Sequence, residues 1–215
     1  MNTDDELNIG IYEFDDDLIA LAKDSPVPRI KIYRPDKILV VLGRGSKPEK
    51  ELNLDACRKD GIEIMRRHGG GCSVVLDPGN VIISVAFKAP GIGQNNKYFK
   101  KISDWLISGL ERTGIKGIYH DGISDLVLKD KKIAGACIYR TKGLLYYSAT
   151  LLFKADLELI ERYLKHPPRE PKYRYGRGHK DFITSLYPDF YSGSIDDFLN
   201  DLLKELGQRY YFNFT

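Results

Sequence analysis

The chain has 215 residues, 42% of them apolar and 29% charged, which is enough for one substantial domain. Its 33 basic residues nearly balance its 30 acidic ones, and a net charge of +3 excludes a general attraction to nucleic acid or to an anionic membrane. The acidic start at 1–10 has no apolar leader, and no stretch approaches the roughly 18 consecutive apolar residues of a membrane span, so we expect a cytoplasmic protein.

Strands dominate the first part of the chain. Alternating and then continuous apolar residues at 30–42 predict one or two strands, and a short helix is expected at about 49–59. Runs of β-branched residues predict three more strands, which we expect to pair as an antiparallel meander, at 62–67, 73–76 and 81–87.

A helix is predicted at 96–113, because its apolar residues recur every three or four positions, at Phe99, Ile102, Leu106 and Leu110. The stretch 123–153 is typical of three strands joined by charged or glycine turns. Two C-terminal helices are expected to begin near Asp156 and after Ser194, where serine suits the N-cap position.

The order of these elements indicates the fold class. Strands outnumber helices, there is no regular alternation of strand and helix, and no Rossmann fingerprint is present. We therefore predict an α+β fold with mixed or antiparallel sheets flanked by helices.

The most informative motif is Arg66-Arg67-His68-Gly69-Gly70-Gly71-Cys72, in which two arginines lead directly into three glycines. Glycines let backbone N–H groups approach an anion, and guanidinium groups donate bidentate hydrogen bonds to phosphate or carboxylate. A flexible glycine turn beside surface arginines is the alternative interpretation.

A second candidate is Lys132, which begins a predicted strand and is followed at once by small residues. A ligand can lie against such a backbone, and an ammonium group there can neutralise charge on a phosphate or an acyl oxyanion. Asp125, seven residues earlier, is a candidate Mg²⁺ ligand or amine acceptor. The alternatives are a solvated hairpin tip for Lys132 and a turn residue for Asp125.

The three cysteines, Cys57, Cys72 and Cys137, show no metal-binding spacing and suggest no disulfide framework. Reduced thiols are therefore expected. The histidines also lack metal-ligand spacing.

Four ordered motifs give the chain a resemblance to the lipoate–protein ligase A family, within the class of biotin and lipoate ligases. They are VVLGRGSKPEKELNLDACRKDGI, IMRRHGGGCSVVLDPGN, GISDLVLKDKKIAGACIYR and TLLFKADL. The resemblance implies a mixed sheet flanked by helices and activation of lipoate by ATP and Mg²⁺ to an acyl-adenylate. It also implies transfer of the acyl group to a lysine of a lipoyl carrier domain or an H-protein-like acceptor.

Carried over to this sequence, the resemblance makes Lys132 the essential catalytic lysine and Asp125 a carboxylate near the phosphate and Mg²⁺. It implies that Ile133 and Gly135 line the acyl tunnel, with Ala134 between them in the binding set. The remaining residues implied to bind the adenylate are those of the glycine loop and of the turn after it: Arg67, His68, Gly69, Gly70, Gly71, Cys72, Asp77 and Asn80.

This sequence also departs from the family. His68 and Gly69 stand where serines are usual, and Tyr147-Ser148-Ala149 replaces a His-His-Gly run. Bacterial ligases of the family usually carry an extra C-terminal domain. We expect 1–215 to be a single catalytic domain without it, so that a separate accessory subunit could supply that part.

Three functions are thus distinguished. The first is a lipoate–protein ligase, although the motifs do not distinguish lipoate from octanoate or biotin. The second is an octanoyl or lipoyl acyltransferase that works through a cysteine thioester at Cys72 or Cys137. The third is an RNA-binding module that uses the basic and aromatic tract 173–180, which the small net charge disfavours. For this tract we prefer a flap over the adenylate phosphate or a docking surface for an acidic carrier domain, with a solvated loop as the alternative.

Overall fold

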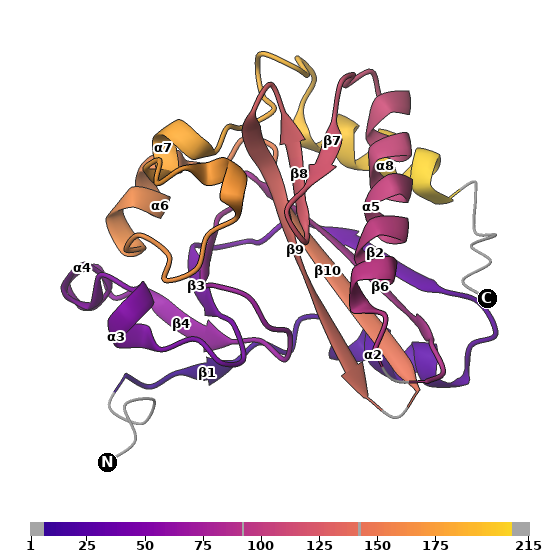
Figure 1. Cartoon of the computed structure of the whole chain (residues 1–215), viewed down its shortest axis with the longest axis horizontal. Helices are drawn as coiled ribbons and strands as arrows, with labels where there is room; N and C mark the ends of the chain where they lie inside the picture. Colours follow the sequence, from indigo (N-terminus) through magenta and orange to yellow (C-terminus); the bar gives the residue numbers. More distant parts are fainter. Residues whose placement is uncertain (1–6, 92, 142, 208–215) are drawn as a thin grey trace.

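The computed structural model describes residues 7–91, 93–141 and 143–207, and its strands form two sheets. Part of the acidic start of the chain lies outside these residues. In the portion described, no helix is both long and apolar enough to cross a membrane. Helices cover the outer faces of both sheets (Figure 1).

The smaller sheet has four strands in the order β1-β4-β3-β5 and is mixed. β4 pairs in parallel with β1 and β3, whereas β5 runs antiparallel to β3. Every residue of β3 is buried, as expected for a strand that is covered on both faces. The strands are Gly10–Ile11 (β1), Leu39–Leu42 (β3), Glu63–Arg66 (β4) and Val74–Leu76 (β5).

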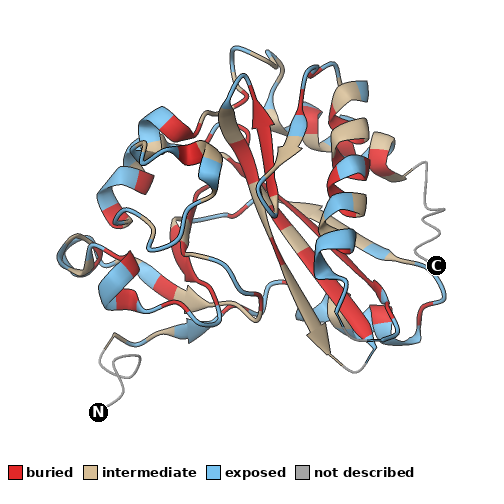
Figure 2. Ribbon diagram, viewed as in Figure 1, coloured by how far each residue is buried: buried red, intermediate tan, exposed pale blue. Residues whose placement is uncertain are grey.

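The larger sheet has six strands in the order β2-β6-β10-β9-β8-β7, and every pair is antiparallel. β6, β8 and β10 are its most buried strands, whereas most residues of β9 are only half-buried (Figure 2). The strands are Arg29–Tyr33 (β2), Asn80–Lys88 (β6), Tyr119–Asp121 (β7), Asp125–Leu128 (β8), Lys131–Thr141 (β9) and Leu144–Leu152 (β10).

The helices divide between the two sheets. α5 and α8 pack on the outer face of the larger sheet, while α4, α6 and α7 contribute to the core on the outer face of the smaller one. The helices are Asp16–Asp24 (α2), Pro48–Glu51 (α3), Leu54–Lys59 (α4), Asn95–Arg112 (α5), Leu157–Tyr163 (α6), the 3-10 turn Lys172–Arg174 (η1), His179–Phe182 (α7) and Ile195–Gly207 (α8).

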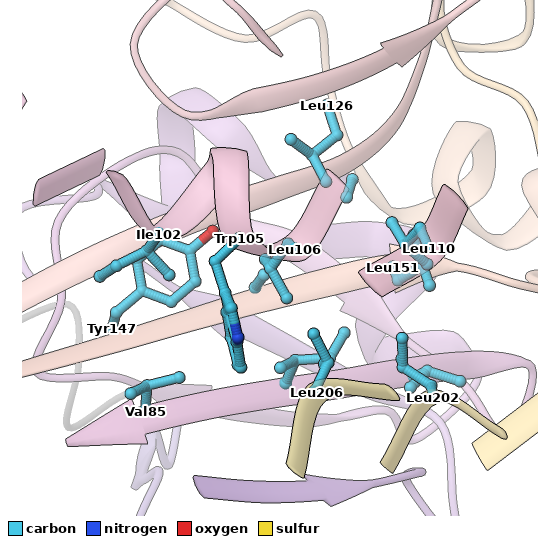
Figure 3. Packing of buried hydrophobic residues seen from close by; sticks show 14 of the residues in the cluster. Val85, Ile102, Trp105, Leu106, Leu110, Leu126, Tyr147, Leu151, Leu202 and Leu206 are labelled. Atoms are coloured by element: carbon cyan, nitrogen blue, oxygen red, sulfur yellow. The ribbon is translucent and has the colours of Figure 1, made fainter. Parts of the chain in front are cut away.

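The largest core lies between α5, α8 and the larger sheet. Trp105 and Leu106 from α5 meet Leu206 from α8 above Val85 of the sheet (Figure 3). The buried face of α5 follows the predicted spacing of three and four residues.

The inner faces of the two sheets pack against each other. Leu39 and Val41 of β3 cluster with Ile82 of β6 and Tyr33 of β2, whereas Val40 of β3 faces the helices on the other side. The face of the larger sheet opposite to α5 is therefore covered by the smaller sheet with its loops and, where Leu18 and Ala22 meet Ala86 and Tyr146, by α2.

The predicted fold class is confirmed, and so are most of the longer elements. α5 lies within one residue of the predicted helix, and β8, β9 and β10 are the three strands expected in 123–153. The predicted N-cap at Ser194 forms, because its hydroxyl accepts a hydrogen bond from the Asp197 amide at 3.1 Å. Asp156, near which the other helix is expected to begin, accepts a hydrogen bond from the Glu158 amide at 2.9 Å.

The antiparallel meander predicted for 62–67, 73–76 and 81–87 is wrong. β4 pairs in parallel with β3, β5 joins the other side of β3, and β6 belongs to the larger sheet. The connection from β3 to β4 is a helical crossover, as a parallel pair requires. Its helix is interrupted at Leu52, which is fully buried and forms a β-bridge with Leu164.

Candidate functional site

A bulge at the start of β9 directs Lys132 toward the inner face of the larger sheet. Asp125 lies opposite Gly135, so an unbroken register would place Lys132 opposite Leu128 and turn it to the outer face. An extra residue on β9 pairs Lys132 with Val127 instead. Lys132 therefore shares a face with Asp125, as their contact confirms.

Lys132 and Asp125 form an ion pair on that inner face. Lys132 Nζ lies 2.8 Å from Asp125 Oδ1, and the Asp125 side chain is only 9% exposed. The site depends on Gly135, because a Cβ there would lie 2.7 Å from Lys132 Nζ. The absence of a side chain at position 135 makes room for the ammonium group.

Tyr173 completes this group and was not predicted from the sequence as a site residue. Its hydroxyl donates a hydrogen bond of 2.9 Å to Asp125 Oδ2, the oxygen that Lys132 does not use. Burial, together with the nearby Asp125 charge, raises the pKa of Tyr173, so the phenol stays protonated at neutral pH. Nothing in the spacing of the sequence connects two residues that are 48 positions apart.

The side chains of Ile133 and Ala134 belong to the core that α5 and α8 cover. The bulge thus places Ile133 and Ala134 on the outer face of the sheet and Lys132 and Gly135 on the inner face. Contact of Ile133 and Gly135 with an acyl chain, and a binding role for Ala134, remain predictions.

The glycine loop connects β4 to β5 and is shaped from inside by Arg67. The guanidinium group donates hydrogen bonds to the backbone oxygens of Val41 at 3.2 Å, Gly70 at 2.7 Å and Cys72 at 2.9 Å. These bonds fold the loop around its own arginine. Binding of an adenylate by Arg67 remains a prediction.

The loop also lies directly on β9. A Cβ at Gly69 would stand 2.6 Å from Cys137 Sγ, so only glycine allows this approach. The His68 ring stacks on Tyr139, with ring centroids 5.1 Å apart. Every second residue of a strand lies on the same face, so Gly135, Cys137 and Tyr139 share one face of β9. The glycine loop covers Cys137 and Tyr139, and Lys132 lies against Gly135, so the loop and Lys132 are on the same inner face.

A buried carboxylate anchors the second half of the loop. Glu51 Oε2 accepts hydrogen bonds from the Ser73 amide at 2.6 Å and from the hydroxyl of Ser46 at 3.0 Å. Ser46 also donates to the Gly71 carbonyl at 3.2 Å, and Cys72 Sγ donates to the Arg169 carbonyl at 3.7 Å. Gly70 forms the open crest, since a Cβ there would meet no atom of the described residues within 4 Å.

Asp77 and Asn80 form the turn between β5 and β6. Asp77 accepts hydrogen bonds from the amides of Gly79 and Asp156, at 2.5 and 3.0 Å, and burial raises the pKa of Asp77. Asn80 Oδ1 accepts from the Asp77 amide at 2.8 Å, which fixes the orientation of the side-chain amide. Asn80 Nδ2 is buried without a partner among the described residues.

Two cysteines lie at this site, but Cys137 is a poor candidate for a nucleophile. Its side chain is covered by Gly69, and burial raises the pKa of its thiol, although Arg67 acts in the opposite direction. Cys72 is partly exposed in the loop.

Two arginines of the basic and aromatic tract 173–180 are engaged in contacts within the protein. Arg174 is 4% exposed and stacks on Phe182, while Arg177 Nη2 donates to the Tyr173 carbonyl at 2.8 Å. Tyr175, at 85% exposure, is the large exposed aromatic side chain of this stretch. These contacts leave little of the stacking surface that a single-strand binder presents.

Among the described residues there is no group of three or more His, Cys, Asp or Glu side chains that could hold a metal ion. The predicted Mg²⁺ ligand, Asp125, is thus a single carboxylate. This suits an ion that takes one or two protein carboxylates and receives its other ligands from phosphates and water.

Comparison with known proteins finds a matching family model and similar enzymes. The family model described as "Lipoyl protein ligase A/B catalytic domain" matches residues 13–207. Lipoate-protein ligase A subunit 1 of Thermoplasma acidophilum is 25% identical over 196 residues, which cover 87% of this chain and 74% of the relative. Lipoate-protein ligase LplJ of Bacillus subtilis is 26% identical over 162 residues, which cover 75% of this chain and 46% of the relative.

Solved structures share the fold. A bi-partite lipoate protein ligase from Thermoplasma acidophilum, described with its E2 lipoyl domain, superposes with a TM-score of 0.76 at 24% identity and covers 96% of this chain and 86% of that one. A lipoate-protein ligase A bound with ATP gives a TM-score of 0.75 at 23% identity and covers 96% and 80%.

Proposed function

We propose that this chain, an enzyme that belongs to the lipoyl protein ligase A/B catalytic domain family, is a lipoate–protein ligase of the cytoplasm. It activates lipoate with ATP to lipoyl-AMP and transfers the lipoyl group to a specific lysine of a carrier protein. The observation that carries the proposal is the ammonium of Lys132, held by Asp125 on the face over which the glycine loop lies.

Lys132 acts in both half-reactions. A lipoate carboxylate oxygen attacks the α-phosphorus of ATP. The bond between the α-phosphorus and the oxygen that bridges it to the β-phosphorus breaks, and pyrophosphate leaves. The ammonium group of Lys132 stabilises the negative charge that develops on the phosphate oxygens. The acceptor lysine, as a free amine, then attacks the lipoyl carbonyl and loses a proton, AMP leaves, and the same ammonium stabilises the oxyanion.

The surrounding groups suit an anionic nucleotide. The crest of the glycine loop is open at Gly70, and Asn80 Nδ2 is a buried donor without a partner among the described residues. Such a donor gains most from an acceptor that arrives with the ligand. ATP binding is also supported by the fold shared with the ATP-bound ligase. When bound, Mg²⁺ would neutralise phosphate charge, and Asp125 would hold it through the lone pairs that its contacts with Lys132 and Tyr173 leave free.

The proposed partners are a lipoyl carrier domain or an H-protein-like acceptor, and a separate accessory subunit. The Thermoplasma relative, described as a bi-partite ligase with an E2 lipoyl domain, supports both.

Pyrophosphate release in the presence of lipoate and Mg-ATP tests the activity. We expect release by the wild-type chain and a loss of at least about 100-fold in Lys132→Ala. The neighbouring Lys131→Ala is the matched control, since the Lys131 ammonium donates to the Lys180 carbonyl at 3.4 Å. If a folded wild-type sample releases no pyrophosphate with lipoate, octanoate or biotin and also fails to bind lipoyl-AMP added ready-made, which bypasses any need for the accessory subunit, the proposal is wrong.

The transferase alternative predicts a different pattern. A thioester mechanism needs a cysteine thiolate, so Cys137→Ser or Cys72→Ser would abolish acyl transfer and wild-type enzyme would carry an acyl group on that cysteine. Our proposal expects both variants to release pyrophosphate and no acyl-cysteine to appear by mass spectrometry. The buried thiol of Cys137, whose pKa is raised, supports this expectation.

A further inference from the structure

Lys132 is held at one end of a chain of three side chains, not in a simple pair. Asp125 Oδ1 binds Lys132 at 2.8 Å, and Asp125 Oδ2 accepts the Tyr173 hydroxyl at 2.9 Å. With one oxygen fixed by Tyr173, rotation of the carboxylate is restricted, and the direction of the other oxygen is set. The phenol thus determines where Asp125 holds the ammonium.

Tyr173 itself is firmly positioned. Its ring packs against Phe182, with centroids 5.0 Å apart, and Arg177 Nη2 donates to its backbone oxygen at 2.8 Å. Arg177 also contacts Asp130 at 3.2 Å, in the turn that precedes Lys132. The segment that carries Tyr173 is therefore tied to the same hairpin as Lys132.

A second tie reaches Lys132 directly. The Thr184 amide donates to the Lys132 carbonyl at 3.0 Å, and Ile183 forms a parallel β-bridge with Lys132. The segment 173–184 thus holds Lys132 in two ways. Ile183 and Thr184 fix its backbone, and Tyr173 fixes its side chain through Asp125.

We propose that Tyr173 is a positioning residue for Lys132 and acts through Asp125. This inference rests on the proposed ligase activity, in which Lys132 must stand ready at the phosphate and the acyl carbonyl. Preorganisation of this kind affects the rate of the chemical step more than ground-state binding. Tyr173 makes no contact with the reacting atoms in this account.

The kinetic test compares Tyr173→Phe with Tyr175→Phe, which removes a hydroxyl from the 85% exposed Tyr175 two residues away. In Tyr173→Phe we expect kcat for pyrophosphate release to fall about 10- to 100-fold, since misplacement by about 1 Å can cost that much. The KM values for ATP and lipoate should stay within about twofold, and Tyr175→Phe should match wild type. Equal kcat values in the two variants would overturn the inference, as would an effect on KM alone.

A double-mutant cycle tests whether Tyr173 acts through Asp125. In the Asp125→Ala background the additional change Tyr173→Phe should cost less than about twofold, because the residue that relays its effect is gone. A loss equal to that in the wild-type background would show a merely structural role. Equal thermal unfolding midpoints for Tyr173→Phe and Tyr175→Phe would exclude a general loss of stability.

A labelling experiment separates this inference from the ligase activity. Limited acetylation by acetic anhydride, read by peptide mass spectrometry, should modify Lys132 several-fold faster in Tyr173→Phe than in wild type, with Lys131 as the internal reference. An unchanged ratio of Lys132 to Lys131 would overturn the inference. Failure of the wild-type enzyme both to release pyrophosphate and to bind added lipoyl-AMP would overturn the ligase activity alone and would leave this readout valid.

Discussion

The ammonium of Lys132 occupies its position because of one missing side chain and two polar partners. Gly135 leaves the space, Asp125 supplies the opposite charge, and Tyr173 holds the second oxygen of that carboxylate. Asp125 is almost fully buried, so its ion pair with Lys132 is screened less by water than a surface pair. The pair therefore orients the lysine side chain, which has four rotatable bonds and would otherwise move freely.

Gly135→Ala tests the space that the ammonium needs. The added Cβ would stand 2.7 Å from Lys132 Nζ and 2.8 Å from its Cε, so the flexible end of the lysine must move. We expect pyrophosphate release to fall by about tenfold or more with little change in the unfolding midpoint. Gly45→Ala is the control, because a Cβ there meets no atom within 4 Å. Full activity of Gly135→Ala would show that Lys132 does not need this position.

For single residues, the sequence indicates which side chains carry the chemistry but not the face of the sheet toward which they point. Lys132 and the glycine loop were nominated from residue types and from the resemblance, and the structure brings them to one face. The bulge that turns Lys132 inward has no signal in the sequence, since it depends on how β8 pairs with β9. Tyr173 was missed because only tertiary folding brings it to Asp125.

Among the elements, α4 and α6 are joined by a charge pair at their ends. Arg162 of α6 donates to Asp60, which follows α4, with Nη2 and Oδ1 2.8 Å apart, and the Tyr163 hydroxyl adds a bond of 2.9 Å. The Arg162 guanidinium lowers the pKa of Asp60 to about 2.

This pair gives a prediction for the dependence of stability on pH. Because the pKa of Asp60 is lower in the folded chain than the ordinary 3.8, its contribution is present above 3.8 and is lost as pH falls toward about 2. We expect the urea midpoint of Asp60→Asn to lie below that of wild type at pH 7, and the two to converge near pH 2. Asp55→Asn is the control, since the Asp55 carboxylate is 99% exposed. A constant difference across this range would contradict the account.

α8 contributes a second testable packing contact. Phe198 is fully buried and stacks on Phe153 at the end of β10, with ring centroids 4.5 Å apart. Phe198→Ala should lower the free energy of unfolding by about 3–5 kcal/mol, because it leaves a cavity. Leu203→Ala, on the half-exposed side of the same helix, should cost about 0.5 kcal/mol. Equal losses in chemical denaturation would show that α8 does not dock as described.

Elements that depend on residues close together in the sequence are predicted correctly, whereas pairings between distant segments are not. α5 and the strands of 123–153 depend on spacing and on turns between neighbours, and they are confirmed. The pairing of β3 with β4 depends on a helical crossover, so the expected meander at 62–87 was wrong. Short elements such as β1 and α7 are too brief for a periodic pattern.

At the scale of the whole molecule, the site lies where the two sheets face each other. The smaller sheet supplies the glycine loop, the larger sheet supplies Lys132 and Asp125, and the C-terminal segment supplies Tyr173. Contacts such as Gly69 on Cys137 join these parts. Because both sheets contribute residues to the site, we expect substitutions in either sheet to affect the same chemical step.

The most direct test of the proposed function is to look for the adenylate on the protein. The wild-type chain is incubated with lipoate and Mg-ATP, desalted, and measured by native and by denaturing mass spectrometry, with Lys132→Ala in parallel. We expect wild type to retain noncovalent lipoyl-AMP, which disappears on denaturation, and Lys132→Ala to retain none. A lipoyl group that stays covalently attached to Cys72 or Cys137 without ATP, and no adenylate with it, would contradict the account.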